Sequence, residues 1–328
     1  MQFLHIIVSV LLARCVSKNQ GEDGYEGFPE SGTSVVVVGH EFFEIVEFLG
    51  AGPKKRAYRA RRLKERPQRF DTQEYTIPLD LGSSVTDRLI PDEVVVKCSA
   101  TDQPKRINKL EGEFKALTFL NRIQSVRKPV GLYLSKQWKC FDDSDFICQY
   151  MVMTMASLDI QKLIRQNMLG LRPPIVEGFA PKALHGIMSF ELFIASFGLC
   201  LMAELEKLHA VGLVHRDVSI KNVALDPSDK TLVYLIDLGS SSFLVKYADS
   251  IPKVESLVKH DFDRVKRVCL QLIALAAAEA YEGVDDSHND LLRIIAATRS
   301  QWELRITLLS FLKLNFPSVQ FDGRIIYQ

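Results

Sequence analysis

The sequence predicts an α+β fold, with strands concentrated in the first half of the chain and helices in the second. Short apolar runs with alternating or β-branched residues recur between positions 42 and 155. Longer runs with helical periodicity dominate the second half, above all Ser189–His209 and Asp261–Ala278. Between these two helices lies a hairpin pattern with polar residues at its ends. These observations predict a sheet, a helical core and a polar site carried by the hairpin.

The composition limits the class of protein and its partners. The 328 residues are 47% hydrophobic and 25% charged, and the formal net charge is +1. This balance is ordinary for a globular domain and gives no reason to expect nucleic acid or an anionic membrane as a partner. The six cysteines show no paired metal-binding spacing and suggest no disulfide framework. Four of them lie in apolar runs and are expected to be buried thiols: Cys98, Cys148, Cys200 and Cys269.

The first 17 residues, Met1–Ser17, resemble a secretory signal peptide. Phe3–Ala13 is an almost unbroken apolar run that is too short to span a bilayer comfortably. Against a signal peptide, no Lys or Arg precedes this run. Two alternatives stay open: the protein enters the secretory pathway, or the run is an N-terminal extension of a cytoplasmic protein. Lys18–Ser34 is polar and Gly-rich and is expected to be a flexible linker, with the folded part beginning near Val35.

The strands of the first half are predicted in order along the chain. Arg61–Glu93 separates the second and third strands and is expected to be a surface insertion, because it holds a basic run and prolines. Lys105–Leu120 carries an apolar stripe at helical spacing and is the one helix expected here. The predicted strands are the two arms of Phe42–Arg61, then Glu93–Cys98, Val130–Leu134 and Phe146–Met155.

The helical half begins with a short helix at Ser157–Asn167 and a proline-containing loop at Met168–Gly186. Ser189–His209 is the strongest helix, since it is apolar on most faces, and Ser189 is its expected N-cap. The remaining predicted helices are Asp261–Ala278, Asp290–Ile295 and Trp302–Leu314.

The hairpin between the two longest helices carries the chemistry. Two short apolar runs, Val223–Leu225 and Leu232–Ile236, flank a polar turn. Pairing of these runs brings together the polar residues at their ends, which are Asp217, Asn222 and Asp237. Hard oxygen ligands of this kind suit a Mg²⁺–phosphate group, and a separate carboxylate suits a nucleophile that must lose a proton.

His215-Arg216-Asp217, the Asn five residues later and Asp237-Leu-Gly resemble the catalytic loop and metal-binding motif of the protein kinase superfamily. The resemblance implies a divergent Ser/Thr-type member with two lobes. Residues 35–156 would form an N-lobe of five antiparallel strands and one helix, with residues 61–93 as its insertion, and residues 157–328 a mostly helical C-lobe. Asp217 would be the catalytic base, while Asn222 and Asp237 would hold Mg²⁺ and thereby ATP. A monomer is expected.

The resemblance extends into the first half of the chain. Lys97, at the end of a predicted buried strand, is similar to the kinase lysine that binds the α- and β-phosphates. Glu113, 16 residues later, is its expected ion-pair partner, and Glu111 is the alternative. Gly50 and Gly52 resemble the glycines of the loop that covers the phosphates.

Three further residues are expected at the nucleotide by the same resemblance, namely Ala60, Met153 and Met155. Met153 would lie behind the adenine. Thr154–Ala156 would be the hinge between the lobes, whose backbone groups would bind the adenine.

The sequence departs from the kinase pattern at three places. Lys55 stands at the third glycine position, and Ser219 stands where a lysine is usual. No Ala-Pro-Glu follows Asp237, and only 24 positions (261 minus 237) separate it from Asp261, which resembles the residue that anchors the catalytic loop. We expect an ATP- and Mg²⁺-dependent protein Ser/Thr kinase that transfers the γ-phosphate to a hydroxyl. Two alternatives stay open: a pseudokinase that binds or scaffolds partners, and a small-molecule kinase.

Overall fold

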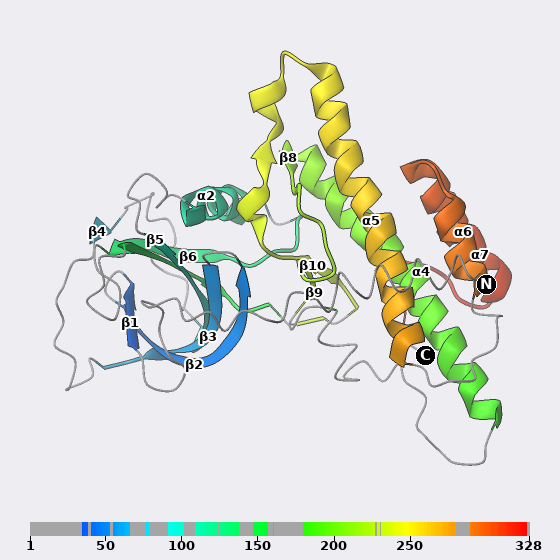
Figure 1. Cartoon of the computed structure of the whole chain (residues 1–328), viewed down its shortest axis with the longest axis horizontal. Coiled ribbons are helices and arrows are strands. Elements are labelled where there is room, and N and C mark those ends of the chain that lie inside the picture. The colour runs from blue at the N-terminus through cyan, green and yellow to red at the C-terminus, as the bar shows by residue number, and fades with distance from the viewer. Residues whose placement is uncertain are drawn as a thin grey trace.

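The computed structural model describes residues 35–38, 41–52, 55–65, 77–78, 91–101, 109–123, 125–137, 147–156, 160, 180–226, 228–229, 231–279 and 289–326. The predicted signal peptide and linker lie outside these ranges, as do most of the expected insertion and, apart from Ile160, the helix expected at Ser157–Asn167. The α+β prediction is confirmed: a curled antiparallel sheet with one helix precedes a helical half (Figure 1).

The described part of the sheet has seven strands in the order β1-β2-β3-β5-β7-β6-β4, and every neighbouring pair is antiparallel. All five predicted strands are present, with boundaries shifted by a few residues. The additional strands are β1, which contributes four valines, and the two-residue β4. The strands are β1 Val35–Val38, β2 Glu41–Gly52, β3 Lys55–Leu63, β4 Ile77–Pro78, β5 Glu93–Thr101, β6 Gly131–Gln137 and β7 Ile147–Thr154.

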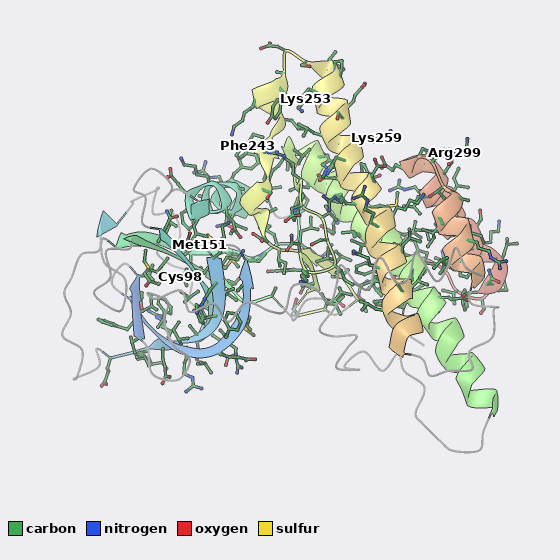
Figure 2. The ribbon with its side chains drawn as sticks, in the orientation of Figure 1. Cys98, Met151, Phe243, Lys253, Lys259 and Arg299 are labelled. Atoms are coloured by element: carbon green, nitrogen blue, oxygen red, sulfur yellow. The ribbon has the colours of Figure 1, made fainter. Side chains whose placement is uncertain are left out.

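The two faces of this sheet bury different cores, because successive side chains of a strand point to opposite faces. Val94, Val96 and Cys98 of β5 face the inside of the curl. Val95 of β5 and Met151 of β7 face the other way, toward helix α2 (Lys109–Asn121) (Figure 2). The second face is therefore the one that meets the rest of the molecule.

Helix α2 packs on that face with the predicted apolar stripe. Leu110, Phe114, Leu117 and Leu120 are all buried. At Gly131 of β6, an added Cβ would lie only 3.2 Å from Leu117 Cβ, so a small residue lets the strand approach the helix closely. The helix is thus held against the sheet at a short distance.

The helical half is built on α4 (Ala180–Ala210) and α5 (Ile251–Glu279), which lie side by side (Figure 1). Helices α6 (Asn289–Ala297) and α7 (Gln301–Asn315) pack against this pair. Their core is continuous with the residues under α2. Among the described residues, no helix is both long and apolar enough to cross a bilayer.

Both long helices begin earlier than the sequence predicted. Helix α4 starts at Ala180, so Ser189 lies within it and is not an N-cap, and the expected loop at Met168–Gly186 is wrong from residue 180 onward. Helix α5 starts at Ile251 and not at Asp261. Each helix has a proline at its second residue. Proline is compatible with a first turn because the N–H it lacks has no partner there.

Cys148 also differs from the expectation of a buried thiol, because it is disulfide-bonded. Cys98, Cys200 and Cys269 are free and buried, as predicted. Burial raises the pKa of each of these three thiols to about 12, so they are neutral at physiological pH.

Candidate functional site

An ion pair connects the sheet to helix α2. Lys97 lies on the α2 face of β5, and its Nζ is 2.5 Å from Glu113 Oε1. The same Nζ donates to Asp237 Oδ1 at 3.2 Å. Glu111, the alternative partner, instead pairs with Lys115 on the helix surface. Lys97 therefore joins residues that are 16 and 140 positions away in the sequence.

Burial and charge set the protonation of this cluster. Burial alone would lower the pKa of Lys97, but the carboxylates of Glu113 and Asp237 outweigh it and raise that pKa above its usual value. Burial would raise the pKa of Asp237, yet Lys97 and Lys55 lower it to about 2. Lys97 is therefore a cation and Asp237 an anion at neutral pH. For Glu113, burial raises the pKa of the carboxyl group and the charge of Lys97 lowers it. Burial is the larger effect, so the pKa of Glu113 lies above its usual value.

Asp261 on α5 holds the loop that carries Asp217. Its two carboxylate oxygens accept the backbone N–H of His215 at 2.8 Å and of Arg216 at 2.7 Å. Oδ2 also lies 2.9 Å from His209 Nε2. Although burial acts to raise the pKa of Asp261, these hydrogen bonds lower it. A buried, ionised carboxylate thus fixes the loop backbone.

His215 links this loop to the strand before Asp237. Its Nε2 lies 3.1 Å from the carbonyl of Ile236, and its Nδ1 accepts the backbone N–H of Asp217 at 3.3 Å. An accepting Nδ1 requires a neutral ring that donates from Nε2. Burial lowers the pKa of His215, which agrees with that neutral form. The imidazole is therefore a structural bridge between the loop and the strand before Asp237.

The hairpin forms as predicted and places its polar ends together. Strand β9 (Val223–Leu225) pairs antiparallel with β10 (Val233–Leu235). Asn222 Nδ2 donates to Asp217 Oδ2 at 3.0 Å and to the Asp217 carbonyl at 2.8 Å. The backbone N–H of Ile236 donates to the Asn222 carbonyl at 3.1 Å, which puts Asn222 beside Asp237.

Two residues of the site adopt left-handed backbone conformations. Arg216 has φ 67° and Asp237 has φ 58°. Non-glycine residues with such angles cost about 1–3 kcal/mol each and persist only where the surroundings impose them. The bonds to Asp261 impose the first, and the contacts of Asp237 with Lys97 support the second.

The segment after Asp237 is short and ordered by contacts. A 3-10 turn at Leu238–Ser240 leads into β11 (Ser242–Phe243), which pairs with β8 (Leu213–Val214). Phe243 lies beside α2 (Figure 2), where it meets Phe119 edge to face with ring centroids 5.1 Å apart. A second 3-10 turn, Leu244–Tyr247, follows.

Thirteen residues, 238 to 250, thus separate Asp237 from the first residue of α5. The segment is shorter than the sequence predicted, since α5 starts ten residues before Asp261. Arg216 Nη1 donates to Ser242 Oγ at 3.0 Å, so the unmodified hydroxyl holds this arginine in place. Neither the Ser242 contact nor the His209 contact with Asp261 was predicted, because no local pattern joins residues so far apart in the sequence.

The glycine hairpin is formed by β2 and β3. Gly50 pairs with Ala57, and Gly52 pairs with Lys55. Ala57 in turn pairs with Lys97, so the start of β3 shares the face that carries this lysine. An added Cβ at Gly50 would meet no atom within 4 Å, which leaves open space beside the hairpin backbone.

The structure does not bring Ala60 to this site, which corrects the expectation for that residue. Ala60 is buried inside the curl and pairs with Val94, on the face opposite Lys97. The odd spacing between Ala57 and Ala60 reverses the face. Met153 is buried on the α2 face, and Met155 packs partly buried against the same cluster.

The residues available to a magnesium ion are few but of the right type. Among the described residues, no group of three His, Cys, Asp or Glu side chains is placed to hold a metal. Mg²⁺ bound with a nucleotide needs only one or two protein oxygens, because phosphates and water supply the rest. Asp237 is ionised, and the amide of Asn222 uses its nitrogen on Asp217, which leaves Oδ1 as an acceptor. This donor set fits Mg²⁺ with phosphate.

Comparisons with known proteins give little at the level of sequence. No family model matches the chain, and no curated protein matches it. Among solved structures it is similar to one titled "Structure of vaccinia related kinase 3", with 13% sequence identity and a TM-score of 0.45. The alignment covers 88% of this chain and 92% of that chain.

The fold is kinase-like. Its architecture is a curled antiparallel sheet with one helix, followed by a helical half. The kinase-like fold brings Lys97, Glu113 and Asp237 into contact, and it brings Asp217 to Asn222.

Proposed function

We propose that the protein is an ATP- and Mg²⁺-dependent phosphotransferase that transfers the γ-phosphate to a hydroxyl. One observation carries the proposal. Lys97, which contacts both Glu113 and Asp237, lies at the same end of the β9–β10 hairpin as the hydrogen-bonded pair Asp217 and Asn222. The group around Lys97 would bind a polyphosphate, and the carboxylate of Asp217 would bind the attacking nucleophile beside it. Phosphoryl transfer depends on such positioning more than on covalent chemistry.

Each residue has one task in this proposal. Lys97, oriented by Glu113, would bind phosphate oxygens as a fixed cation. Asn222 and Asp237 would hold Mg²⁺, which supplies positive charge to the phosphate oxygens when bound. Asp217, held by the Asn222 amide, would accept the proton of the attacking hydroxyl.

We propose a protein serine or threonine hydroxyl as the acceptor, following the resemblance of the catalytic loop. A small-molecule hydroxyl is the second candidate, and one observation favours it. Only residues 238–250 connect Asp237 to α5. This leaves less chain for a peptide-docking surface than the kinase pattern provides.

The experiment incubates the full chain with γ-labelled ATP, Mg²⁺ and two acceptor sets, one of generic proteins and one of small hydroxyl compounds. Transfer is expected with one set, and Asp217→Asn should reduce it by about 10²–10⁴-fold while ATP still binds. Binding of ATP without transfer to either set would indicate a pseudokinase and would overturn the proposal. Equal transfer by Asp217→Asn would remove Asp217 from its role.

A further inference from the structure

Lys55 lies on the same side of the sheet as Lys97, although it departs from the glycine pattern of the hairpin. It is the first residue of β3, two residues before Ala57, which pairs directly with Lys97. The even spacing puts Lys55 and Ala57 on one face. The Lys55 side chain is 26% exposed, whereas that of Lys97 is 12% exposed. Lys55 is therefore the more accessible of the two cations.

Glu113 faces both lysines with separate oxygens. Its Oε1 contacts Lys97, while its buried Oε2 accepts no hydrogen bond from the described residues. Lys55 Nζ lies 4.0 Å from this Oε2, which is too far for a hydrogen bond. The contact is an ion pair without a directed bond, and a stronger anionic partner would replace it readily.

The absence of a side chain at Gly239 makes room for this arrangement. A Cβ there would lie 2.8 Å from Lys55 Nζ and 3.1 Å from Asp237 Oδ1. It would also lie 3.4 Å from Glu113 Oε2. Lys55 therefore reaches the space directly above the Asp-Leu-Gly turn.

The charges in this space balance. Lys55 and Lys97 supply two positive charges, and Glu113 and Asp237 supply two negative ones. Asp237 is the residue that would pass to Mg²⁺ in the proposed reaction, and its loss as a partner would leave the lysines in excess. An entering polyphosphate would supply the missing negative charge.

We infer that Lys55 is a second phosphate-binding lysine, which shares Glu113 with Lys97 and leaves Glu113 Oε2 when a nucleotide polyphosphate enters. The inference rests on the proposed function. A lysine has a flexible stem and three donors, so a shift of a few ångströms changes its partner without moving β3. The third glycine position is thus used for charge and not for close approach of the backbone.

The test measures affinities for ATP, ADP and adenosine by calorimetry, with Mg²⁺ present. Lys55→Met should weaken ATP and ADP binding about tenfold, the loss of one charged hydrogen bond, and leave adenosine binding unchanged. Lys64→Met, an exposed lysine just beyond the end of the same strand, is the matched control and should behave as wild type. Lys55→Met/Lys97→Met should bind ATP more weakly than either single variant, and any remaining preference for ATP over adenosine would then depend on Mg²⁺.

Lys55→Arg keeps the charge and should retain most of the ATP affinity, which also covers the case that Lys55→Met does not fold. If wild type binds ATP and Lys55→Met binds it equally well, the inference is overturned and the proposed function stands. A parallel loss of adenosine affinity would also overturn it, because Lys55 would then shape the site and not bind phosphate. If wild type binds neither ATP nor adenosine, the proposed function fails as well.

Discussion

Asp261 shows how one buried side chain can hold a loop. Its carboxylate accepts two backbone N–H groups and contacts His209, and the side chain is fully buried. Each of these donors would otherwise be left unpaired in the interior, where an unsatisfied group costs about 1–3 kcal/mol. The left-handed conformation of Arg216 depends on the same contact.

Asp261→Asn should therefore lower the free energy of unfolding by about 3 kcal/mol, because the amide loses one acceptor oxygen and turns an N–H₂ group toward a donor. Urea unfolding measures the change. Asp263→Asn, an exposed position on the same helix, is the control and should change stability by less than about 0.5 kcal/mol. Similar losses for both variants would contradict the anchoring role.

Asp237 predicts a specific dependence on pH. Its pKa is lowered to about 2 in the folded protein, against about 3.9 for an unperturbed Asp in the unfolded chain. A lowered pKa contributes stability that is fully present above the unfolded value and is lost as pH falls toward the folded value. The difference in unfolding free energy between wild type and Asp237→Asn should therefore shrink between pH 4 and pH 2.

Urea unfolding of both proteins across this range measures the difference directly, and it cancels the acid titration of carboxylates that do not interact with Asp237. A difference that stays constant with pH would mean that Lys97 and Lys55 do not stabilise the charged form of Asp237.

At the scale of elements, the helical half depends on close approach. Gly198 of α4 faces α5 and α7, where an added Cβ would lie 2.9 Å from Leu308 Cδ1 and 3.0 Å from Cys269 Sγ. Both neighbours are buried, so neither can move freely. Gly112 of α2 offers a contrast, because a Cβ there would meet nothing within 4 Å.

Gly198→Ala should destabilise the protein by about 1 kcal/mol, since an overpacking cost of about 1–3 kcal/mol exceeds the helix-propensity gain of alanine. Gly112→Ala should stabilise it by up to about 1 kcal/mol through the same propensity gain without a clash. Thermal and urea unfolding of the pair checks the two signs. Stabilisation by both substitutions would show that α4 has room at Gly198.

The sequence predicted these elements wherever a local pattern decides them. The β-branched run of β5, the stripe of α2 and the hairpin β9–β10 are set by side-chain periodicity. The starts of α4 and α5 could not be predicted, because proline is common both in loops and in the first turn of a helix, and the sequence does not distinguish the two cases. Ala60 was misplaced because its odd spacing from Ala57 puts it on the opposite face of β3, and the pairing of β3 with β5 decides which of the two faces carries Lys97.

The part of the candidate site that lies within one short stretch of sequence could be predicted, and the part that depends on contacts between distant residues could not. The spacing of Asp217, Asn222 and Asp237 is local to one hairpin. The contact of Lys97 with Glu113 was expected only through resemblance, and the structure forms it. The contacts of Ser242 and of Lys55 each join elements that are far apart in the sequence, and no short stretch of sequence encodes such pairings.

At the scale of the whole molecule, polar contacts between described residues link the two halves both at the site and away from it. Lys97 reaches Asp237 at the site. Away from it, Arg127 Nη1 donates to Glu204 Oε1 of α4 at 2.6 Å, and the Arg127 carbonyl accepts the backbone N–H of Leu235 at 3.0 Å. Glu204 is nearly fully buried, whereas the Arg127 side chain is 33% exposed, so the carboxylate end of this ion pair is the part that is shielded from water. The sheet and the helical half should therefore unfold together.

A ligand bound between Lys97 and Asp237 should stabilise both halves at once. MgATP at 100 times its dissociation constant is expected to raise the unfolding free energy by about 2.7 kcal/mol, and EDTA should remove the part that depends on metal. Far-UV circular dichroism and tryptophan fluorescence, to which Trp302 of α7 contributes, should report the same shifted urea midpoint. Arg127→Ala removes the side-chain part of the second link, although its backbone hydrogen bond to Leu235 stays, and it should move the two midpoints apart. A wild-type shift seen by only one probe would mean that the halves respond to the nucleotide independently.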